Sequence, residues 1–278
     1  MGNQQNEPQQ LYLNLLKNVL TYYLWGETER PFIVPASPAV KRTFYKSLKS
    51  FLSKRGIKMV REMEFDRQAR KEGRDWPLKA DTMIGLQRLD NLQQCLEDVI
   101  RNNIPGDVIE TGVWRGGATI FMRAVLKAYG ITDKKVWVAD SFEGLPKPNP
   151  EKYPVDLDDN LHSYDFLRVS VDSVRENFNR YGLLDDQVQF LKGWFKDTLP
   201  GAPIQKLSLM RLDGDMYEST MDALNNLYPK LSIGGYVIID DYNLKTCVEA
   251  VTDFRKEHKI TSPLQKADWA GVYWKKTE

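Results

Sequence analysis

The chain of 278 residues carries 39 Lys and Arg against 38 Asp and Glu, and 42% of it is hydrophobic. This content excludes a wholly disordered chain and suits one large α/β domain with additions, or two modest domains. A formal net charge of +1 excludes a global field that would recruit nucleic acid or an anionic membrane, so we expect neither partner.

The N-terminal part of the chain is expected to be helical. We expect residues 1–10 to be disordered, because they are polar, and residues 11–27 to form an amphipathic helix, because Leu and Tyr recur at helical spacing. Prolines break this pattern at 31–38, and a second, basic amphipathic segment follows at 41–61. The basic segment favours a solvated peripheral helix over a surface for a membrane or an anionic partner.

Short apolar strands alternate with helical segments from Asp107 onward, after a turn and helix predicted over 82–103. This alternation indicates βαβ units and a mostly parallel sheet with helices on both faces. The C-terminal end lacks a helical interval and suits a closing antiparallel pair. The strands are predicted at 107–113, 135–141 and 188–194, in the run that starts at 207 and in the run that starts at 234, with helices beginning near 117, 168 and 217.

Two of the predicted strands end in pairs of acids, Asp213 with Asp215 and Asp240 with Asp241. Asp is a poor strand former, so these side chains are expected where each strand emerges into its loop. Ligands of open α/β sheets bind at the carboxyl ends of the strands, which makes the acids candidate site residues. The simpler alternative for the first pair is that it caps the helix that begins near Tyr217.

A glycine-rich loop follows the first strand, at residues 110–119. Its three glycines allow close approach of a ligand, or form a tight turn. Their spacing is not that of a dinucleotide fingerprint, and no Walker Lys follows, so a phosphate site is disfavoured. Asp140 ends the second strand at the distance where nucleotide folds hold ribose hydroxyls. With Glu110 it describes a site for a nucleoside with a cationic or neutral tail, such as S-adenosylmethionine.

Four segments resemble the macrocin O-methyltransferase family of sugar methyltransferases, which use S-adenosylmethionine and magnesium. The resemblance covers the chain from about residue 80 to the C-terminus. It implies a class I methyltransferase (Rossmann-like) α/β fold with an antiparallel C-terminal strand, and a homodimer or larger assembly. We expect residues 1–80 to form a helical extension with lid and subunit contacts, and residues 81–278 the methyltransferase domain. The matching segments are 108–126, 136–148, 193–200 and 212–242.

The resemblance also implies roles for individual residues. Asp215 is implied as the general base, since a carbohydrate hydroxyl is too weakly acidic to react unaided. Magnesium would be held by Asp213, Asp240 and Asp241, which suits a hard ion that needs oxygen ligands, and two neighbouring hydroxyls of the acceptor would complete the site. The implied cofactor-binding residues are Met83, Glu110, Thr111, Gly112, Trp114, Thr119, Asp140, Ser141, Trp194 and Asp197.

The expected activity is therefore methyl transfer to a hydroxyl of a small natural-product acceptor, with a sugar moiety as the expected target. The alternatives are a catechol-type methyltransferase, which would not need Asp215, and a non-catalytic S-adenosylmethionine-binding protein. Two histidines and no cysteine cluster exclude a zinc site, and the role of His162 stays open. Cys95 and Cys247 lie far apart in the sequence, which favours reduced thiols and a cytoplasmic protein.

Overall fold

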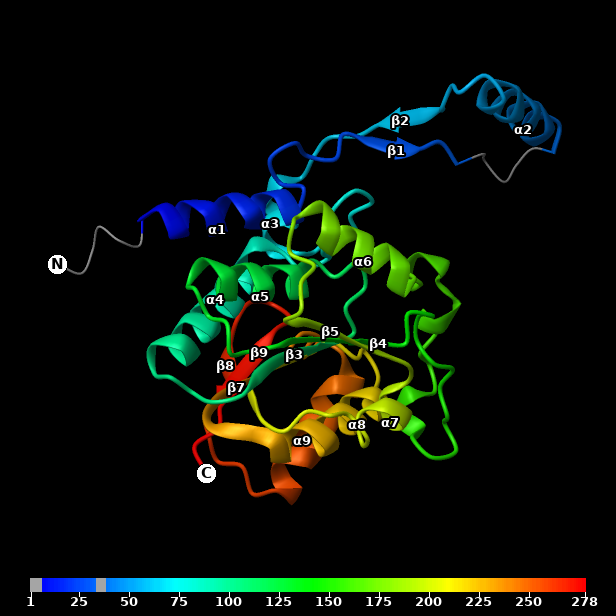
Figure 1. Ribbon diagram of the computed structural model, residues 1–278. Coiled ribbons are helices and arrows are strands. Elements are labelled where there is room, and N and C mark those ends of the chain that lie inside the picture. Colours follow the sequence, from blue (N-terminus) through cyan, green and yellow to red (C-terminus); the bar gives the residue numbers. More distant parts are fainter. Residues whose placement is uncertain (1–6, 34–38) are drawn as a thin grey trace.

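The computed structural model describes residues 7–33 and 39–278, without the side chains of residues 39–42. In this part of the chain a seven-stranded sheet has the order β5-β4-β3-β6-β7-β9-β8 (Figure 1). The strands from β5 to β7 are parallel, and β9 and β8 are antiparallel. The main-sheet strands are β3 (Asp107–Thr111), β4 (Val136–Asp140), β5 (Val188–Lys192), β6 (Leu207–Leu212), β7 (Leu231–Ile239), β8 (Gln265–Lys266) and β9 (Val272–Lys275).

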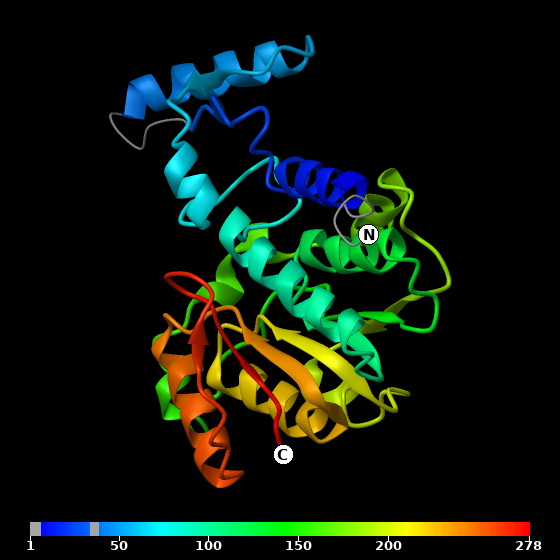
Figure 2. The same ribbon diagram turned by 90° about the vertical axis from the view of Figure 1, so that its left-hand side faces the viewer.

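Helices cover both faces of this sheet (Figure 2). One hydrophobic cluster joins the sheet to α1, α4, α5 and α6, and a second joins the opposite face to α8 and α9. The predicted doubly covered, mostly parallel sheet with an antiparallel C-terminal pair is confirmed. The helices of these layers are α1 (Glu7–Leu20), α3 (Arg67–Glu72), α4 (Leu86–Arg101), α5 (Gly117–Ala128), α6 (Val171–Arg180), α7 (Phe195–Thr198), α8 (Tyr217–Leu227) and α9 (Lys245–Glu257).

The strand order reverses between β3 and β6, because the chain leaves β3 toward β4 on one side and returns through β6 on the other. Both strands are buried on two faces, which explains their nearly continuous apolar sequences. Their pairing sets Glu110 beside Arg211 and Thr111 beside Leu212. A crevice at the carboxyl ends of these strands is the expected place for a ligand.

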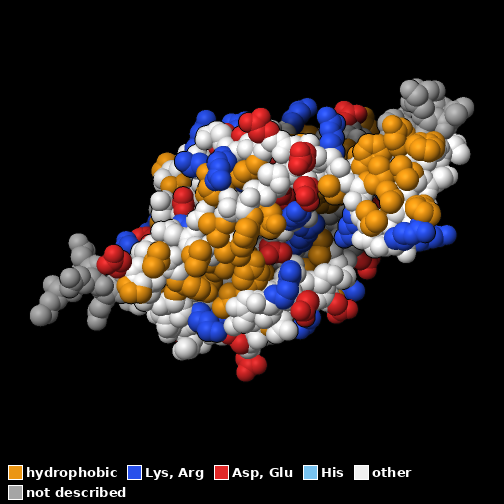
Figure 3. All heavy atoms as spheres, turned by 90° about the horizontal axis from the view of Figure 1, so that it is seen from above, with side chains coloured by type: hydrophobic (Ala, Val, Ile, Leu, Met, Phe, Trp, Pro, Cys, Tyr) orange, Lys and Arg blue, Asp and Glu red, His pale blue; other side chains and the backbone are white. Residues whose placement is uncertain are grey.

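The N-terminal region divides into a packed helix and a projecting arm. Helix α1 buries Leu13, Leu16 and Leu20 against the cluster formed with α4 and α5. The arm consists of β1 (Glu29–Pro31), α2 (Ala39–Ser53) and β2 (Val60–Glu62), and it extends away from the sheet (Figure 1). Hydrophobic side chains gather on the arm and along α1 when the molecule is seen from above (Figure 3).

The N-terminal helix boundaries differ from those expected. Helix α1 begins at Glu7 and ends at Leu20, so the predicted disorder is wrong for residues 7–10, while residues 1–6 lie outside the described chain. Leu13, Leu16 and Leu20 pack on the core and draw the preceding polar turn into the helix. The basic helix predicted to reach residue 61 ends at Ser53, and the chain then enters β2.

The long loop at 142–166 is tied to α8 by Asp156. This side chain is buried, and its carboxylate accepts hydrogen bonds from the backbone N–H groups of Tyr217 (2.8 Å) and Glu218 (3.2 Å). Asp156 therefore caps the N-terminus of α8 from a distant part of the sequence. The loop region contains the short 3-10 helices η1 (Pro154–Asp156), η2 (Leu161–Ser163) and η3 (Asp165–Leu167), and η4 (Tyr228–Lys230) follows α8.

Over residues 7–33 and 39–278, each helix falls short of the length and apolar character that crossing a bilayer would require.

Candidate active site

A cavity of about 300 Å³ opens at the carboxyl ends of β3, β4 and β6. Such a volume is at the lower end of small-molecule sites. It collects residues from the glycine-rich loop, the end of β4, the loop after it and the acid-tipped end of β6. The predicted site residues that line it are Met83, Gly112, Trp114, Asp140, Ser141, Trp194, Asp213 and Asp215.

Gly112 permits the ends of β3 and β6 to meet. Its φ is 79°, and a Cβ at this position would lie 1.7 Å from the carbonyl oxygen of Asp213. The backbone N–H of Asp213 donates to the carbonyl of Thr111 at 2.9 Å, which holds the two strand ends together. The glycine is thus required by a close approach as well as by a turn.

Asp140 fastens the two loops that border the cavity. Its carboxylate accepts hydrogen bonds from the backbone N–H groups of Val113 and Phe142, each at 2.7 Å. Burial raises the pKa of Asp140 above its ordinary value, although these hydrogen bonds oppose the shift. The Ser141 hydroxyl also donates to this carboxylate across 3.4 Å, and the carboxylate oxygens are acceptors of the kind that ribose hydroxyls would require.

Trp114 joins the glycine-rich loop to the end of the long loop. Its indole N–H donates to the carbonyl of Phe166 at 3.0 Å, and the two rings lie 5.3 Å apart. The backbone of Trp114 is left-handed, with φ of 49°. The side chain therefore has a packing role and also lines the cavity.

Three carboxylates converge beside the cavity. Oxygen atoms of Asp213, Asp215 and Asp241 lie within 4.8 Å of one another. Burial and then neighbouring carboxylates raise the pKa of Asp215 and Asp241 well above that of free aspartate. Within the described chain, the buried Oδ2 of Asp241 has no hydrogen-bond partner. This donor set fits a hard divalent cation, which would balance the charge and satisfy the open oxygen.

The alternative role of the first acid pair, capping of α8, is not what the structure contains. The N-cap residue is Met216, and no side-chain cap is made by it. Asp156 supplies the capping carboxylate instead. Asp213 and Asp215 are thus left to face the cavity.

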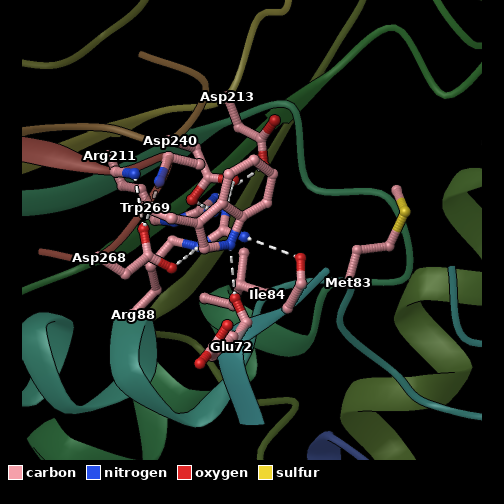
Figure 4. A network of polar contacts seen from close by, with 12 residues as sticks. Glu72, Met83, Ile84, Arg88, Arg211, Asp213, Asp240, Asp268 and Trp269 are labelled. Carbon is pink, nitrogen blue, oxygen red and sulfur yellow. Dashed lines mark hydrogen bonds and ion pairs between the residues drawn. The ribbon is translucent and has the colours of Figure 1, made fainter. Parts of the chain in front are cut away.

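An ion-pair chain runs from Asp213 through Arg211, Asp240 and Arg88 to Asp268 (Figure 4). The Arg211 guanidinium bonds to Glu110, to Asp213 at 3.1 Å and to Asp240. Arg88 of α4 bonds to the other oxygen of Asp240. These ion pairs connect β3, β6, β7 and α4, because these elements meet at the end of the sheet where the parallel strands have their carboxyl ends.

Arg88 extends the ion-pair chain to the C-terminal loop. Its Nε lies 3.0 Å from the fully buried Asp268 carboxylate. Next to Asp268, the indole of Trp269 donates to the carbonyl of Glu72 at 2.8 Å. The loop before β9 is thereby fastened to the C-terminal end of α3, as Figure 4 shows.

Burial and pairing determine the charges of the residues in the ion-pair chain. Burial raises the pKa of Glu110 to about 8, although Arg211 opposes the shift. Burial alone would lower the pKa of Arg211, but Asp240, Glu110 and Asp213 together raise it well above its ordinary value. Arg211 is therefore cationic, which holds the surrounding carboxyl groups in place.

The predicted metal ligand Asp240 lies between two guanidinium groups. One carboxylate oxygen faces Arg211 and the other faces Arg88. It is 3% exposed, and the converging oxygen atoms beside the cavity come from Asp213, Asp215 and Asp241 instead. Each oxygen of Asp240 retains a lone pair, so its assignment as a metal ligand stays a prediction.

Several predicted cofactor residues lie outside the cavity lining. Glu110, Thr111 and Thr119 are buried behind the glycine-rich loop, where the Thr119 hydroxyl donates to the carbonyl of Gly116 at 3.0 Å. Asp197 is exposed on α7. His162 borders a neighbouring groove with Arg168. The roles assigned to the first four residues stay predictions.

The cavity also contains residues that the sequence did not single out. Lys147 and Asn149 come from the long loop, and Glu218 and Asp222 come from one face of α8. Burial and then Glu218 raise the pKa of Asp222 to about 6. Glu218 and Asp222 are four residues apart, which places both on one face of the helix that follows the acid-tipped strand. This spacing was the signal in the sequence that could have identified them.

Comparison with known proteins gives a consistent result. The family model described as Macrocin-O-methyltransferase (TylF) matches residues 9–276. An 8-demethyl-8-(2,3-dimethoxy-alpha-L-rhamnosyl)-tetracenomycin-C 4'-O-methyltransferase of Streptomyces olivaceus is 50% identical, over 96% of this chain and 93% of the relative. The mycinamicin III 3''-O-methyltransferase of Micromonospora griseorubida is 52% identical, over 79% and 87%. The solved O-methyltransferase NovP is 45% identical with a TM-score of 0.83, over 97% of this chain and 100% of that chain.

Replacing Arg211 by Met should destabilise the protein strongly, because Glu110 and Asp240 would remain buried with one counter-charge fewer. We expect a loss of about 3–5 kcal/mol in the free energy of unfolding, measured by chemical denaturation. The control Arg101→Met removes an exposed arginine that pairs within one helix turn, and it should change stability by less than about 0.5 kcal/mol. Equal effects of the two substitutions would contradict the importance of the buried pairs.

Proposed function

The chain belongs to the macrocin O-methyltransferase (TylF) family, and on this premise we propose that it methylates a sugar hydroxyl of a natural product. It is an O-methyltransferase. The methyl donor is S-adenosylmethionine, and the reaction depends on magnesium. The observation that supports this most directly is the convergence of Asp213, Asp215 and Asp241 beside the cavity that Gly112 and Asp140 border.

The cavity residues fit the proposed cofactor. Gly112 exposes backbone where a ligand approaches the end of β3, and Asp140 offers carboxylate acceptors for a ribose diol. Met83 lies on the opposite part of the lining, where Arg70 fixes its carbonyl oxygen through a hydrogen bond. Trp194 supplies an apolar wall. These residues hold and orient the donor, while the donor itself supplies the methyl group.

The acidic residues divide into holding and proton-accepting roles. Asp213, Asp240 and Asp241 would hold Mg²⁺ beside Asp215, and the ion would supply Lewis-acid activation of the acceptor hydroxyl. Asp215 accepts the hydroxyl proton on its carboxylate as the oxygen attacks the methyl carbon. Its raised pKa favours proton uptake, because burial and Asp213 disfavour its charged form.

The acceptor class follows from two considerations. The relatives named above are 4'-O- and 3''-O-methyltransferases, of which the first acts on a compound with a rhamnosyl group. The cavity adds Glu218, Asp222 and Asn149, which are suited to hydroxyl donors rather than to an aromatic face. We therefore assign a glycosylated acceptor, with the long loop covering it.

The projecting arm is proposed as a subunit contact in a homodimer or larger assembly. Phe44 and Phe51 on α2 are 63% and 53% exposed, and Ile33 beside β1 is 84% exposed. Burying the two exposed phenylalanines of this helix against a second chain would stabilise the assembly.

The two cysteines are free and buried, which is typical of a protein in the reducing cytoplasm.

Asp215→Asn should lower kcat by about 10²–10⁴ because the amide cannot accept the proton. The dissociation constant of S-adenosylmethionine, measured by calorimetry, should stay close to that of the wild type, since Asp215 contacts the acceptor side. Rates are measured with a glycosylated acceptor and mass detection of the methyl gain. A near-normal rate would instead favour methylation of a more acidic phenolic hydroxyl.

Magnesium should stabilise the protein more at about pH 8 than at about pH 6. The pKa values of the proposed ligands Asp213 and Asp241 are raised in the folded protein by burial and then by neighbouring carboxylates. A carboxyl group whose pKa is raised by folding stabilises the folded protein below its unfolded pKa. This stabilisation is lost as the pH rises through its folded pKa, because the buried group must then carry a charge. The metal removes this penalty, so the rise in Tm on adding Mg²⁺ should grow with pH. A pH-independent rise would contradict metal binding at these carboxylates.

Replacing both Phe44 and Phe51 by Asp should reduce the oligomer to a smaller species. The new charges cannot be buried in an apolar contact without a large desolvation cost. Light scattering after size exclusion measures the mass. Lys46→Glu on the same helix is the control, and it should leave the mass unchanged. An unaltered mass of the double variant would exclude α2 from the contact.

A further inference from the structure

The peptide carbonyl of Asp215 receives two side-chain hydrogen bonds from the start of α9. The Thr246 hydroxyl donates to this oxygen, and the Cys247 thiol donates to it across 3.3 Å. Asp215 follows β6, whereas Thr246 and Cys247 follow β7. The contact therefore joins the two connections that carry the acid pairs.

This carbonyl belongs to a residue with an unfavourable backbone conformation. Asp215 has φ of 56°, in the left-handed region that residues other than Gly adopt uncommonly. Contacts with the surroundings stabilise such a residue in this conformation. The same dihedral angles set the direction of the carbonyl and of the Cα–Cβ bond. Holding the carbonyl therefore also aims the carboxylate into the cavity, toward Asp213 and Asp241.

Cys247 lies on α9, and its side chain contacts α8. It is 1% exposed, and its sulfur lies 3.5 Å from the hydroxyl of Thr220 on α8. Burial raises the pKa of the thiol well above its ordinary value, so the sulfur keeps the proton that it donates. Thr220 is buried as well, which leaves this group of side chains inaccessible to water.

We propose that Thr246 and Cys247 are positioning residues that hold Asp215 in its left-handed conformation and thereby aim its carboxylate at the acceptor hydroxyl. The inference rests on the proposed role of Asp215 as the base. Neither side chain touches the reacting atoms. Both act through the backbone of Asp215, and their loss lets this residue relax to an ordinary conformation that points its carboxylate elsewhere.

The test begins with Thr246→Val, which removes the hydroxyl and keeps the branched shape of the side chain. We expect kcat to fall about tenfold, with the KM for the acceptor and the affinity for S-adenosylmethionine unchanged. Thr246→Ser should restore kcat because it returns the donor. The matched control is Thr252→Val on the same helix, where an exposed hydroxyl donates to the carbonyl of Val248 at 2.6 Å, and it should leave kcat unchanged.

A second variant guards against failure of the first to fold. Cys247→Ala removes the weaker donor, and we expect a fall in kcat of about twofold to threefold. A wild-type kcat in both Thr246→Val and Cys247→Ala would overturn the inference. A fall in kcat that Thr246→Ser does not restore would overturn it as well, because shape and not hydrogen bonding would then matter.

The double variant separates this inference from the proposed function. If Thr246 acts through Asp215, then Thr246→Val should not lower the rate further in the Asp215→Asn background. An additive loss would show that Thr246 acts elsewhere and would overturn the inference alone. A near-normal rate of Asp215→Asn by itself would refute the base, and the positioning role would fall with it.

Discussion

The guanidinium of Arg211 is the group on which the arrangement of the site depends. It lies near the carboxyl end of the buried strand β6, where an unpaired charge would be very costly, and its partners come from three strand ends. Replacing such a set by apolar side chains can be neutral for stability, so its main effect is to specify one arrangement. A shift of β6 by one residue would turn Arg211 to the other face of the sheet and leave Glu110 without its counter-charge.

The same edge of the sheet concentrates more negative charge than its arginines balance. Two helices that follow the acid-tipped strands, α8 and α9, begin beside the carboxylates, and the positive ends of their dipoles favour anions there. Arg88 and Arg211 neutralise part of the remainder from behind. Asp213, Asp215 and Asp241 converge beside the cavity, where Asp213 contacts Arg211, and the remaining negative charge fits the cationic ligands proposed above.

Sequence patterns predicted the parts of the structure that local physics determines. Alternating apolar runs located the strands, and the poor strand propensity of Asp located the acids at the strand ends. The patterns did not reveal Arg88 or Asp268, because their partners are distant in the chain and a charge on an amphipathic helix usually faces water. They also did not reveal the left-handed backbone of Asp215 and Trp114, since neither residue type requires it and only contacts made after folding hold it.

Asp156 gives the long loop a property that matters for redesign. The loop is fixed to the scaffold at an interior point, the cap on α8, and again near its end, where the carbonyl of Phe166 meets Trp114. The loop is therefore divided into two short spans, one from the end of β4 to Asp156 and one from Asp156 to Phe166. Each span could be lengthened or exchanged to admit a different acceptor while the other keeps its path. A graft that replaced the whole loop without an acid at the capping position would instead uncap α8 and disturb the helix that lines the cavity next to the end of β6.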